Sequence, residues 1–327
     1  MSQKLINTYC NNFKATSLSC FFFEKTLIKP AINQFIATFQ NNVSLYIKRE
    51  DLLHPFVSGN KLRKLKYNIL EAKCQKKDTL ITFGGAFSNH IAAVAYAGFE
   101  NGLKTIGIIR GDELQNKIEE NPTLSFAKKH GMLFEFISRE VYRMKNSLDY
   151  INKIATKYPN SFLIPEGGTN SLAIKGCEEI LTLDDQNFDY ICTCVGTAGT
   201  ISGLINSAKT AKILGFSALK GNFLENEIAK WTVKHNWELN TDYHFGGYAK
   251  VTDELIIFIN NFKKQYQIPL DPVYTSKMVF GVLDLIEKNY FAPNTKILMI
   301  HTGGLQGIAG MNQLLRKQNK TLIDTDE

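Results

Sequence analysis

Short runs of apolar residues, many of them β-branched or aromatic, recur along the chain and alternate with longer stretches of helical spacing. Because neighbouring positions within each run are nearly all apolar, both faces of such strands should be buried, as happens when crossover helices cover a parallel sheet. The pattern therefore predicts an α/β fold with open, mostly parallel twisted sheets flanked by helices. The predicted strands are residues 80–83, 105–109, 133–137, 162–164, 190–195 and 297–300.

The strand and helix alternation between residues 66 and 165 is complete in itself, whereas the glycine-rich segments lie on both sides of this region. We therefore expect two domains, a small inserted domain at 66–165 and a large domain formed by residues 1–65 together with 166–327. The active site would then lie in the cleft between them. The pattern weakens from residue 216 to 272, although residues 253–262 place apolar side chains on one helical face.

The composition excludes several classes of function. The net charge of +7 comes from 32 lysines and six arginines spread along 327 residues, so no basic face for nucleic acid is expected. No run approaches the ~18 apolar residues of a membrane span, and no export signal is recognisable, so we expect a cytoplasmic protein without membrane contact. The cysteines lack metal-type spacing, and neither a metal site nor a disulfide is expected. The expected free thiols are Cys10, Cys20, Cys74, Cys177, Cys192 and Cys194.

Lys61 is the first candidate for chemistry. It follows Ser58, Gly59 and Asn60 and precedes an amphipathic pattern that predicts a helix, with Asn60 as its N-cap. In the first helical turn, the positive end of the helix dipole should lower the pKa of the Lys61 amine. An amine that is more often neutral can form a Schiff base. An ordinary surface lysine is the alternative interpretation of this position.

A second candidate is the segment 83–90, which joins the predicted strand 80–83 to a helix of small residues. Ligands of open α/β sheets bind at the carboxyl ends of the strands. There, Ser88, Asn89 and His90 would present a hydroxyl, an amide and an imidazole group. A capping turn, with Ser88 or Asn89 at the N-cap of the helix, explains the same residues without a ligand.

The segment 196–200 follows the predicted strand 190–195 and precedes another helix. Glycines allow the backbone to approach an anion closely, and a helix N-terminus supplies positive potential, so we expect a phosphate site here. A simple change of chain direction is one alternative. A nicotinamide-dependent oxidoreductase is another, although the Gly-x-Gly-x-x-Gly spacing is missing. The phosphate-binding candidates are Gly196, Thr197, Ala198, Gly199 and Thr200.

Three further side chains lie beside turns rather than in apolar stripes. Thr302 follows the predicted strand 297–300 and offers a neutral hydroxyl at its carboxyl end. Tyr274 follows an Asp-Pro-Val sequence, and Tyr248 follows two glycines. Both tyrosines are candidates for a ligand site, and packing of the aromatic ring is the alternative role for either.

Together and in this order, the segments resemble the pyridoxal-phosphate enzymes of the tryptophan synthase β-like class, fold type II. Within that class they are most similar to the family of D-cysteine desulfhydrase and 1-aminocyclopropane-1-carboxylate (ACC) deaminase. The resemblance covers nearly the whole chain, and so many ordered matches are hard to obtain by accident. The matching motifs are residues 48–51 (Lys-Arg-Glu-Asp), 58–64 (Ser-Gly-Asn-Lys-Leu-Arg-Lys), 88–90 (Ser-Asn-His), 165–170 (Pro-Glu-Gly-Gly-Thr-Asn), 196–200 (Gly-Thr-Ala-Gly-Thr), 271–274 (Asp-Pro-Val-Tyr) and 301–304 (His-Thr-Gly-Gly).

The resemblance implies pyridoxal 5'-phosphate as cofactor and gives each candidate a role. Lys61 is implied as the Schiff-base lysine, and Lys64 together with residues 196–200 as the phosphate site. Asn89 is implied to bind the ring hydroxyl and Thr302 to face the ring nitrogen. The residues implied to bind the substrate are Ser88, Asn89, His90, Tyr248 and Tyr274. The residues implied to be catalytic are Lys61, Ser88 and Tyr274.

The residue opposite the ring nitrogen is expected to select the reaction. A threonine hydroxyl cannot keep this nitrogen protonated as a carboxylate does, which favours rapid β-elimination over long-lived carbanions. Lys61, displaced by the incoming amine, is expected to take the proton from the substrate Cα. We therefore expect a D-cysteine desulfhydrase-like reaction on a small amino acid, giving pyruvate, ammonia and sulfide.

Departures from the family pattern keep other functions open. ACC deaminases carry an acidic residue where this chain has Thr275, yet ACC deaminase, giving 2-oxobutyrate and ammonia, is the second hypothesis. Phe87 and Ala92 stand where the family has glutamine and arginine, and Ser276 stands at a usual glycine. A cofactor-binding protein with little turnover is therefore the third hypothesis. The resemblance also implies a homodimer.

Overall fold

The computed structural model describes residues 29–325. Of the expected free thiols, Cys10 and Cys20 lie outside these residues, Cys74 is exposed, and the buried Cys177, Cys192 and Cys194 are free. Within the described range, no helix has both the length and the apolar character that a membrane crossing requires. The same range holds no cluster of three side chains suited to a metal ion.

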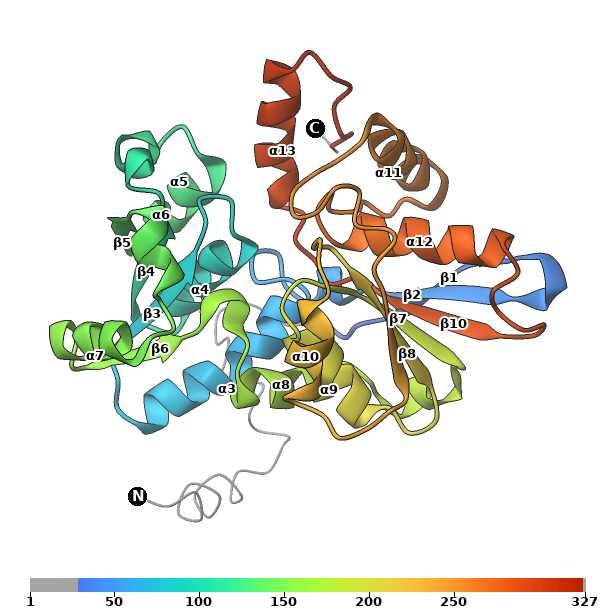
Figure 1. Ribbon diagram of the computed structural model, residues 1–327, viewed down its shortest axis with the longest axis horizontal. Helices are drawn as coiled ribbons and strands as arrows, with labels where there is room; N and C mark the ends of the chain where they lie inside the picture. Colours follow the sequence, from blue (N-terminus) through green and yellow to red (C-terminus); the bar gives the residue numbers. More distant parts are fainter. Residues whose placement is uncertain (1–28, 326–327) are drawn as a thin grey trace.

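The described strands form two sheets, which lie in the two halves of the molecule in Figure 1. The larger sheet has the order β1-β2-β10-β7-β8-β9, and only β1 runs antiparallel to its neighbour. The smaller sheet has the order β5-β4-β3-β6 and is wholly parallel. The predicted α/β fold with mostly parallel sheets is confirmed. The strands are β1 (Asn33–Thr38), β2 (Ser44–Lys48), β3 (Thr79–Gly84), β4 (Lys104–Arg110), β5 (Met132–Ile137), β6 (Ser161–Ile164), β7 (Tyr190–Val195), β8 (Lys212–Ser217), β9 (Trp237–Asn240) and β10 (Lys296–Ile300).

Helices cover both sheets, as expected for parallel strands joined by crossovers (Figure 1). They are α3 (Asn60–Cys74), α4 (Asn89–Glu100), α5 (Pro122–Lys129), α6 (Arg139–Arg143), α7 (Leu148–Lys157), α8 (Ser171–Glu178), α9 (Gly199–Ser207), α10 (Phe223–Ala229), α11 (Asp253–Tyr266), α12 (Thr275–Glu287) and α13 (Gly307–Lys317). The helical face predicted at residues 253–262 is the buried side of α11.

Alternation along β10 shows how the larger sheet is buried. Ile297 and Met299 pack into a core with residues of α11, α12 and α13, whereas Leu298 and Ile300 pack with residues of α8, α9 and α10. Successive side chains of a strand point to opposite faces, so a wholly apolar strand requires helices on both sides. This requirement explains why the apolar runs predict the layered fold.

Helix α3 lies against both halves of the molecule. Leu65, Ile69 and Ala72 belong to the core that covers one face of the smaller sheet. On its other side α3 packs closely against α8, where a Cβ on Gly176 would lie 1.9 Å from the Arg63 carbonyl oxygen. All strands of the smaller sheet lie between residues 79 and 164. The expected boundary between residues 65 and 66 falls inside α3, and the division into two domains stays a prediction.

Candidate active site

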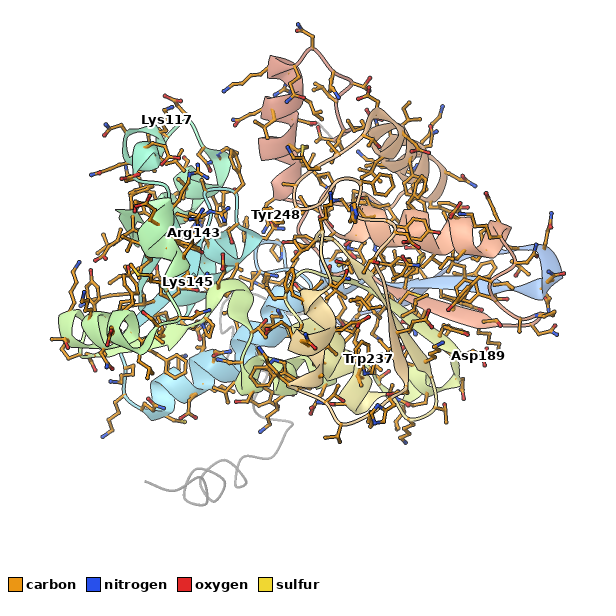
Figure 2. All side chains as sticks on the ribbon, viewed as in Figure 1. Lys117, Arg143, Lys145, Asp189, Trp237 and Tyr248 are labelled. Carbon is orange, nitrogen blue, oxygen red and sulfur yellow. The ribbon has the colours of Figure 1, made fainter. Side chains whose placement is uncertain are left out.

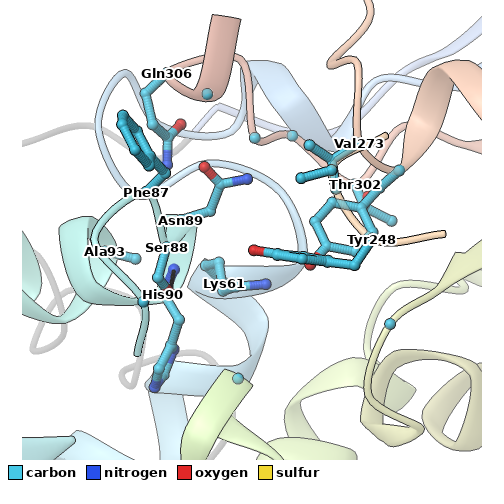
Figure 3. A pocket seen from close by; sticks show the side chains of 18 of the residues that line it. Lys61, Phe87, Ser88, Asn89, His90, Ala93, Tyr248, Val273, Thr302 and Gln306 are labelled. Atoms are coloured by element: carbon cyan, nitrogen blue, oxygen red, sulfur yellow. Dashed lines mark hydrogen bonds between the residues drawn. The ribbon is translucent and has the colours of Figure 1, made fainter. Parts of the chain in front are cut away.

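A cavity of about 510 Å³ is lined by the loops that follow β3, β7 and β10 and by the starts of α3 and α12. Tyr248 lies between the two halves of the molecule in Figure 2, and Figure 3 shows Lys61, Asn89, Tyr248 and Thr302 around the same space. The sequence places these residues far apart, and the sheets bring them together. Of the predicted site residues, all line the cavity except Ala198 and Gly199, which form the start of α9.

The start of α3 differs from the sequence prediction, which placed Asn60 at the N-cap. Gly59 occupies the N-cap with φ 60° and ψ −140°, and Asn60 is the first helical residue. The Asn60 backbone N–H donates to the Thr302 carbonyl (3.2 Å), while its side-chain Nδ2 donates to Thr200 Oγ1 (2.9 Å). Asn60 therefore ties α3 to α9 and to the loop after β10 instead of capping its own helix.

The Lys61 amine lies inside the cavity and donates a hydrogen bond to Asn60 Oδ1 (3.1 Å). Burial lowers the pKa of this amine, and weaker opposing effects come from Cys194, Cys177 and Asp271. The direction is the predicted one, but the main cause is loss of contact with water rather than the helix dipole. A neutral amine is the form that attacks a carbonyl group.

Lys64 lies one helical turn from Lys61 and is almost completely buried. Its Nζ donates to the Gly167 carbonyl (3.1 Å), Thr169 Oγ1 (3.2 Å) and Thr197 Oγ1 (3.2 Å). Burial and the nearby charge of Lys61 lower the pKa of Lys64 to about 7. Every described partner of this ammonium group is neutral, so an anion bound here would stabilise its charge.

The turn between β7 and α9 completes a site for that anion. Ala198 is at the N-cap of α9 and offers no side chain to the first amide groups, which leaves them open to a ligand. A glycine at position 199 lets the α9 N-terminus lie close to Lys64, because a Cβ there would be 2.9 Å from Thr169 Oγ1 and 3.2 Å from Lys64 Nζ. The predicted phosphate segment thus lies directly against Lys64.

We expect cofactor-free Lys64→Met protein to be more stable than the wild type at pH 6, by on the order of 3 kcal/mol. Below about pH 7 the folded protein must carry the buried charge, whereas above it the folded protein releases the proton that the unfolded chain keeps up to the ordinary lysine pKa. Raising the pH therefore removes a cost of folding, and the stability gap should shrink towards pH 10. Urea unfolding of both proteins from pH 6 to 10 measures this gap, and a gap independent of pH would contradict the expectation.

Ser88 and Asn89 begin α4. Ser88 is the N-cap, and its Oγ accepts from the backbone N–H of His90 (3.2 Å) and of Ile91 (3.4 Å), as the capping interpretation predicted. Asn89 lies against the loop after β10, where a Cβ on Gly304 would be 2.7 Å from Asn89 Nδ2. Asn89 Oδ1 is buried without a hydrogen-bond partner among the described residues. Such an orphaned acceptor is costly unless a ligand satisfies it.

The His90 imidazole points away from Lys61 (Figure 3). Its Nε2 is 2.8 Å from Thr82 Oγ1, which itself donates to the Ile164 carbonyl (2.9 Å), so Nε2 must carry the proton that binds Thr82. Burial, followed by the charges of Lys61 and Lys64, lowers the pKa of His90 well below its ordinary value. A Cβ on Gly168 would lie 2.9 Å from His90 Cε1. The neutral ring therefore joins β3, β6 and the loop that binds Lys64.

Tyr274 and Tyr248 form one wall of the cavity. Tyr274 is the N-cap of α12, and its ring lies against the phosphate turn, since a Cβ on Gly196 would be 2.7 Å from Tyr274 Cε1. The centroids of the Tyr248 and Tyr274 rings are 6.3 Å apart. Burial raises the pKa of Tyr274 well above its ordinary value, with a further contribution from Tyr248. Tyr274 therefore keeps its hydroxyl proton at neutral pH.

Thr302 has two neutral side chains as its hydrogen-bonding partners. Its Oγ1 is 3.1 Å from Cys194 Sγ and 3.3 Å from Thr275 Oγ1. Burial raises the pKa of the Cys194 thiol to about 12, so this thiol is not charged at neutral pH. Thr302, Cys194 and Thr275 therefore offer hydroxyl and thiol groups, but no carboxylate, to a basic atom of a ligand.

Sequence reasoning missed Arg110, the last residue of β4, as part of the cavity lining. Its guanidinium lies 5.7 Å from the centroid of the Tyr142 ring and 3.5 Å from where a Cβ on Gly85 would lie. No carboxylate of the described residues forms an ion pair with it. Glu166, which also lines the cavity, binds Lys145 (3.1 Å) and the Tyr142 hydroxyl (2.6 Å). Its position directly after the predicted strand 105–109 is the signal that could have found it.

A family model described as pyridoxal-phosphate-dependent enzyme matches residues 33–303. The chain belongs to this family. The bifunctional D-cysteine desulfhydrase/1-aminocyclopropane-1-carboxylate deaminase of Arabidopsis thaliana mitochondria is 33% identical over 82% of this chain and 74% of that protein. The D-cysteine desulfhydrase of Klebsiella pneumoniae is 27% identical over 80% of this chain and 86% of its own. A crystal structure of an ACC deaminase homologue shares 26% identity, covers 92% of this chain and 98% of its own, and has a TM-score of 0.76.

The cavity of this pyridoxal-phosphate-dependent enzyme fits its cofactor in three independent respects. The buried Lys61 amine has the lowered pKa that attack on an aldehyde requires. The buried Lys64 ammonium group and the open N-terminus of α9 suit a phosphate group. The orphaned Asn89 Oδ1 leaves an unsatisfied polar atom for a ring substituent. The chain therefore has the fold type II architecture of the tryptophan synthase β-like class together with a matching site.

Proposed function

We propose that the protein eliminates the β-substituent of a small amino acid, as a D-cysteine desulfhydrase does, and releases pyruvate, ammonia and sulfide. The observation that carries this proposal is one cavity that combines the Lys61 amine of lowered pKa with a cationic phosphate site and a wall of neutral hydroxyl groups. Bound pyridoxal phosphate supplies the electron sink that weakens the bonds at the substrate Cα. The chain supplies binding, orientation and proton transfer.

The cofactor-binding residues are proposed as follows. Lys61 would form the covalent link, and Lys64 with the turn 196–200 would hold the phosphate. Asn89 would accept a hydrogen bond from the ring hydroxyl at its orphaned Oδ1, and Thr302 would face the ring nitrogen. Support for the last role comes from the two hydrogen-bonding partners of Thr302, because the Cys194 thiol and the Thr275 hydroxyl carry no carboxylate that would keep the nitrogen protonated.

The substrate is proposed to lie between the start of α4 and the two tyrosines. Ser88 and Asn89 bind its carboxylate at the N-terminus of α4, where the helix dipole favours an anion. The Lys61 amine, free once the substrate is bound, takes the Cα proton. Tyr274 keeps its proton and can donate it to the departing sulfur atom. Arg110 adds an unpaired positive charge to the same cavity.

For His90 the geometry favours a role other than the predicted contact with substrate. Its ring bonds to Thr82 and is directed away from Lys61, so it fixes the loop that carries Ser88 and Asn89. His90 is therefore proposed to position Ser88 and Asn89 and not to contact the substrate. Tyr248 is proposed to close the substrate side of the cavity beside Tyr274.

ACC deaminase is the second proposed function. The Arabidopsis relative carries both activities in its name, and the similar crystal structure is that of an ACC deaminase homologue. The absence of an acidic residue at Thr275, within reach of Thr302, argues for elimination instead. A cofactor-binding protein with little turnover is the third. Phe87, which stands where the family has glutamine, lines the cavity and packs against α13, where a Cβ on Gly310 would meet its ring at 2.5 Å.

An assay of pyruvate, 2-oxobutyrate and sulfide on purified protein separates these functions. We expect pyruvate and sulfide from D-cysteine, with much lower rates for L-cysteine, D-serine and ACC. Release of 2-oxobutyrate from ACC at a higher rate would establish the deaminase function instead. A protein with the visible absorbance of bound cofactor and no product from any substrate would support the third proposal.

The homodimer, which the family resemblance implies, and the cytoplasmic location, which was expected because no export signal is recognisable, both stay predictions. Sedimentation equilibrium of the full chain tests the first of them. Fractionation of cells that produce the protein tests the second.

A further inference from the structure

The segment 241–252, which joins β9 to α11 and carries Tyr248, has an unusual backbone. We call it the Tyr248 loop. Four of the five residues 245–249 have positive φ angles: Phe245 (50°), Gly246 (91°), Gly247 (110°) and Ala249 (54°). Two of the four are not glycine, and such residues adopt this conformation only when surrounding contacts enforce it. The position of Tyr248 therefore depends on what holds the loop.

Lys277, in the first turn of α12, binds the backbone of the Tyr248 loop. The side chain is among the largest fully buried ones in the described chain, with 1% of the residue exposed. Its Nζ donates to the His244 carbonyl and to the Gly247 carbonyl, both at 2.8 Å. Burial lowers the pKa of Lys277 to about 8, and Asp271 opposes this effect. A buried ammonium group is costly, and here two loop carbonyls compensate for much of its lost hydration.

The other hydrogen bonds of this part of the loop are internal. The Gly247 N–H donates to the His244 carbonyl (3.0 Å), the Gly246 N–H to His244 Nδ1 (2.9 Å) and the Lys250 N–H to the Gly247 carbonyl (3.2 Å). Between residues 244 and 250, the backbone hydrogen bonds to the rest of the described chain both come from Lys277. Lys277 is thus the polar anchor of the stretch that contains Tyr248.

The same helix also fixes the second tyrosine of the cavity. Tyr274 is the N-cap of α12, three residues before Lys277, and its ring lies beside that of Tyr248. Aromatic packing adds to the connection, because Phe245 of the loop contacts Phe280 of α12 with ring centroids 5.1 Å apart. Helix α12 therefore positions Tyr274 directly at its N-cap, and it positions Tyr248 through the hydrogen bonds of Lys277 to the Tyr248 loop.

We propose that Lys277 is a positioning residue that sets the place of Tyr248 relative to Tyr274 and thereby determines how tightly the cavity holds its substrate. Lys277 acts through the His244 and Gly247 carbonyls and does not line the cavity. The inference rests on the proposed function in that Tyr248 faces the substrate.

Replacement of Lys277 by methionine, which keeps the length and removes the donors, tests the proposal. We expect KM for D-cysteine to rise about tenfold with a much smaller change in kcat, since the loss of two hydrogen bonds displaces Tyr248 without touching Lys61. Backbone hydrogen exchange of residues 244–250 in the cofactor-free protein should become at least tenfold faster, with the exchange of α12 unchanged. The affinity for pyridoxal phosphate should not change.

A double substitution separates positioning from a general structural role. If Lys277 acts through Tyr248, adding Lys277→Met to a Tyr248→Ala protein should raise KM little further. Lys277→Gln, which keeps an N–H donor group without the charge, should restore part of the wild-type KM and serves as the second variant if Lys277→Met does not fold. Additive effects on KM, or unchanged exchange in the loop, would overturn the proposal. Faster exchange along the whole chain together with lost cofactor affinity would also overturn it.

Hydrogen exchange and cofactor affinity do not depend on turnover. If the wild-type protein releases no product from any substrate, the proposed function fails, whereas loop exchange still decides whether Lys277 holds the Tyr248 loop. If the wild type is active and the loop exchange of Lys277→Met is unchanged, only the role of Lys277 fails.

Discussion

Replacing Lys61 by alanine is expected to lower pyruvate release from D-cysteine by at least about 10³-fold and to remove the visible absorbance of the bound cofactor. The Lys61 amine lies in the cavity beside the proposed phosphate site, and its lowered pKa suits the nucleophile that we propose it to be. Its loss would remove both the proposed covalent link and the proposed base for the Cα proton. Absorbance spectra and pyruvate assays measure the two effects separately.

A lysine at the other end of the same helix provides the matched control. Lys73 is exposed and donates its hydrogen bond to Asn101 Oδ1, far along α3 from the cavity. Lys73→Ala should therefore keep the absorbance and the activity of the wild type. Pyruvate release and an unchanged spectrum in Lys61→Ala would show that another group carries the cofactor, and the proposed mechanism would be wrong.

Replacing Gly59 by alanine is expected to cost at least about 3 kcal/mol of the free energy of unfolding. The added Cβ would lie 2.1 Å from the Thr302 carbonyl oxygen and 2.7 Å from the Gly303 nitrogen. Both contacts are with backbone, which cannot rotate away as a side chain can. The start of α3 must then move, and with it Lys61, so cofactor affinity should fall together with stability.

Gly102→Ala separates this clash from backbone strain. Gly102 has a similar φ of 67°, but nothing lies within 4 Å of an added Cβ. We expect it to cost only about 1 kcal/mol and to leave cofactor binding unchanged. Urea unfolding and titration with pyridoxal phosphate measure both proteins. Equal losses of stability in the two variants would show that the contact between Gly59 and Thr302 is unimportant.

The sequence pattern predicted the strands whose residues are nearly all apolar, which include the buried strands β3, β4, β7 and β10 as well as the edge strands β5 and β6 of the smaller sheet. It missed β1 and β9, which lie at the edges of the larger sheet and mix polar with apolar residues. It also missed β2, which has polar ends, and β8, which contains Gly215. The Gly215 position is fixed by tertiary packing, because a Cβ there would lie 2.5 Å from the Ile201 side chain on α9.

The candidate site was predicted where a local motif determines a local geometry. Ser88 caps α4, and the turn before α9 leaves its amide groups open, as loops at strand ends often do. The cap of α3 was predicted wrongly, because the partner of Asn60 is Thr200, 140 positions away. Arg110 and Lys277 were not predicted, because no local motif indicates their surroundings in the folded chain.

By itself, the sequence determined the α/β class, the order of the proposed ligand-binding loops and the types of group that each loop offers. These features depend on the spacing of apolar residues and on turn residues, which act over a few positions of the chain. Only the tertiary structure decided which of these groups meet in one cavity and in which direction they point. The His90 ring faces Thr82, and Thr302 has neutral partners. Lys277 binds the backbone of the loop that carries Tyr248. Burial and long-range hydrogen bonds set these features, and both arise only when distant segments pack together.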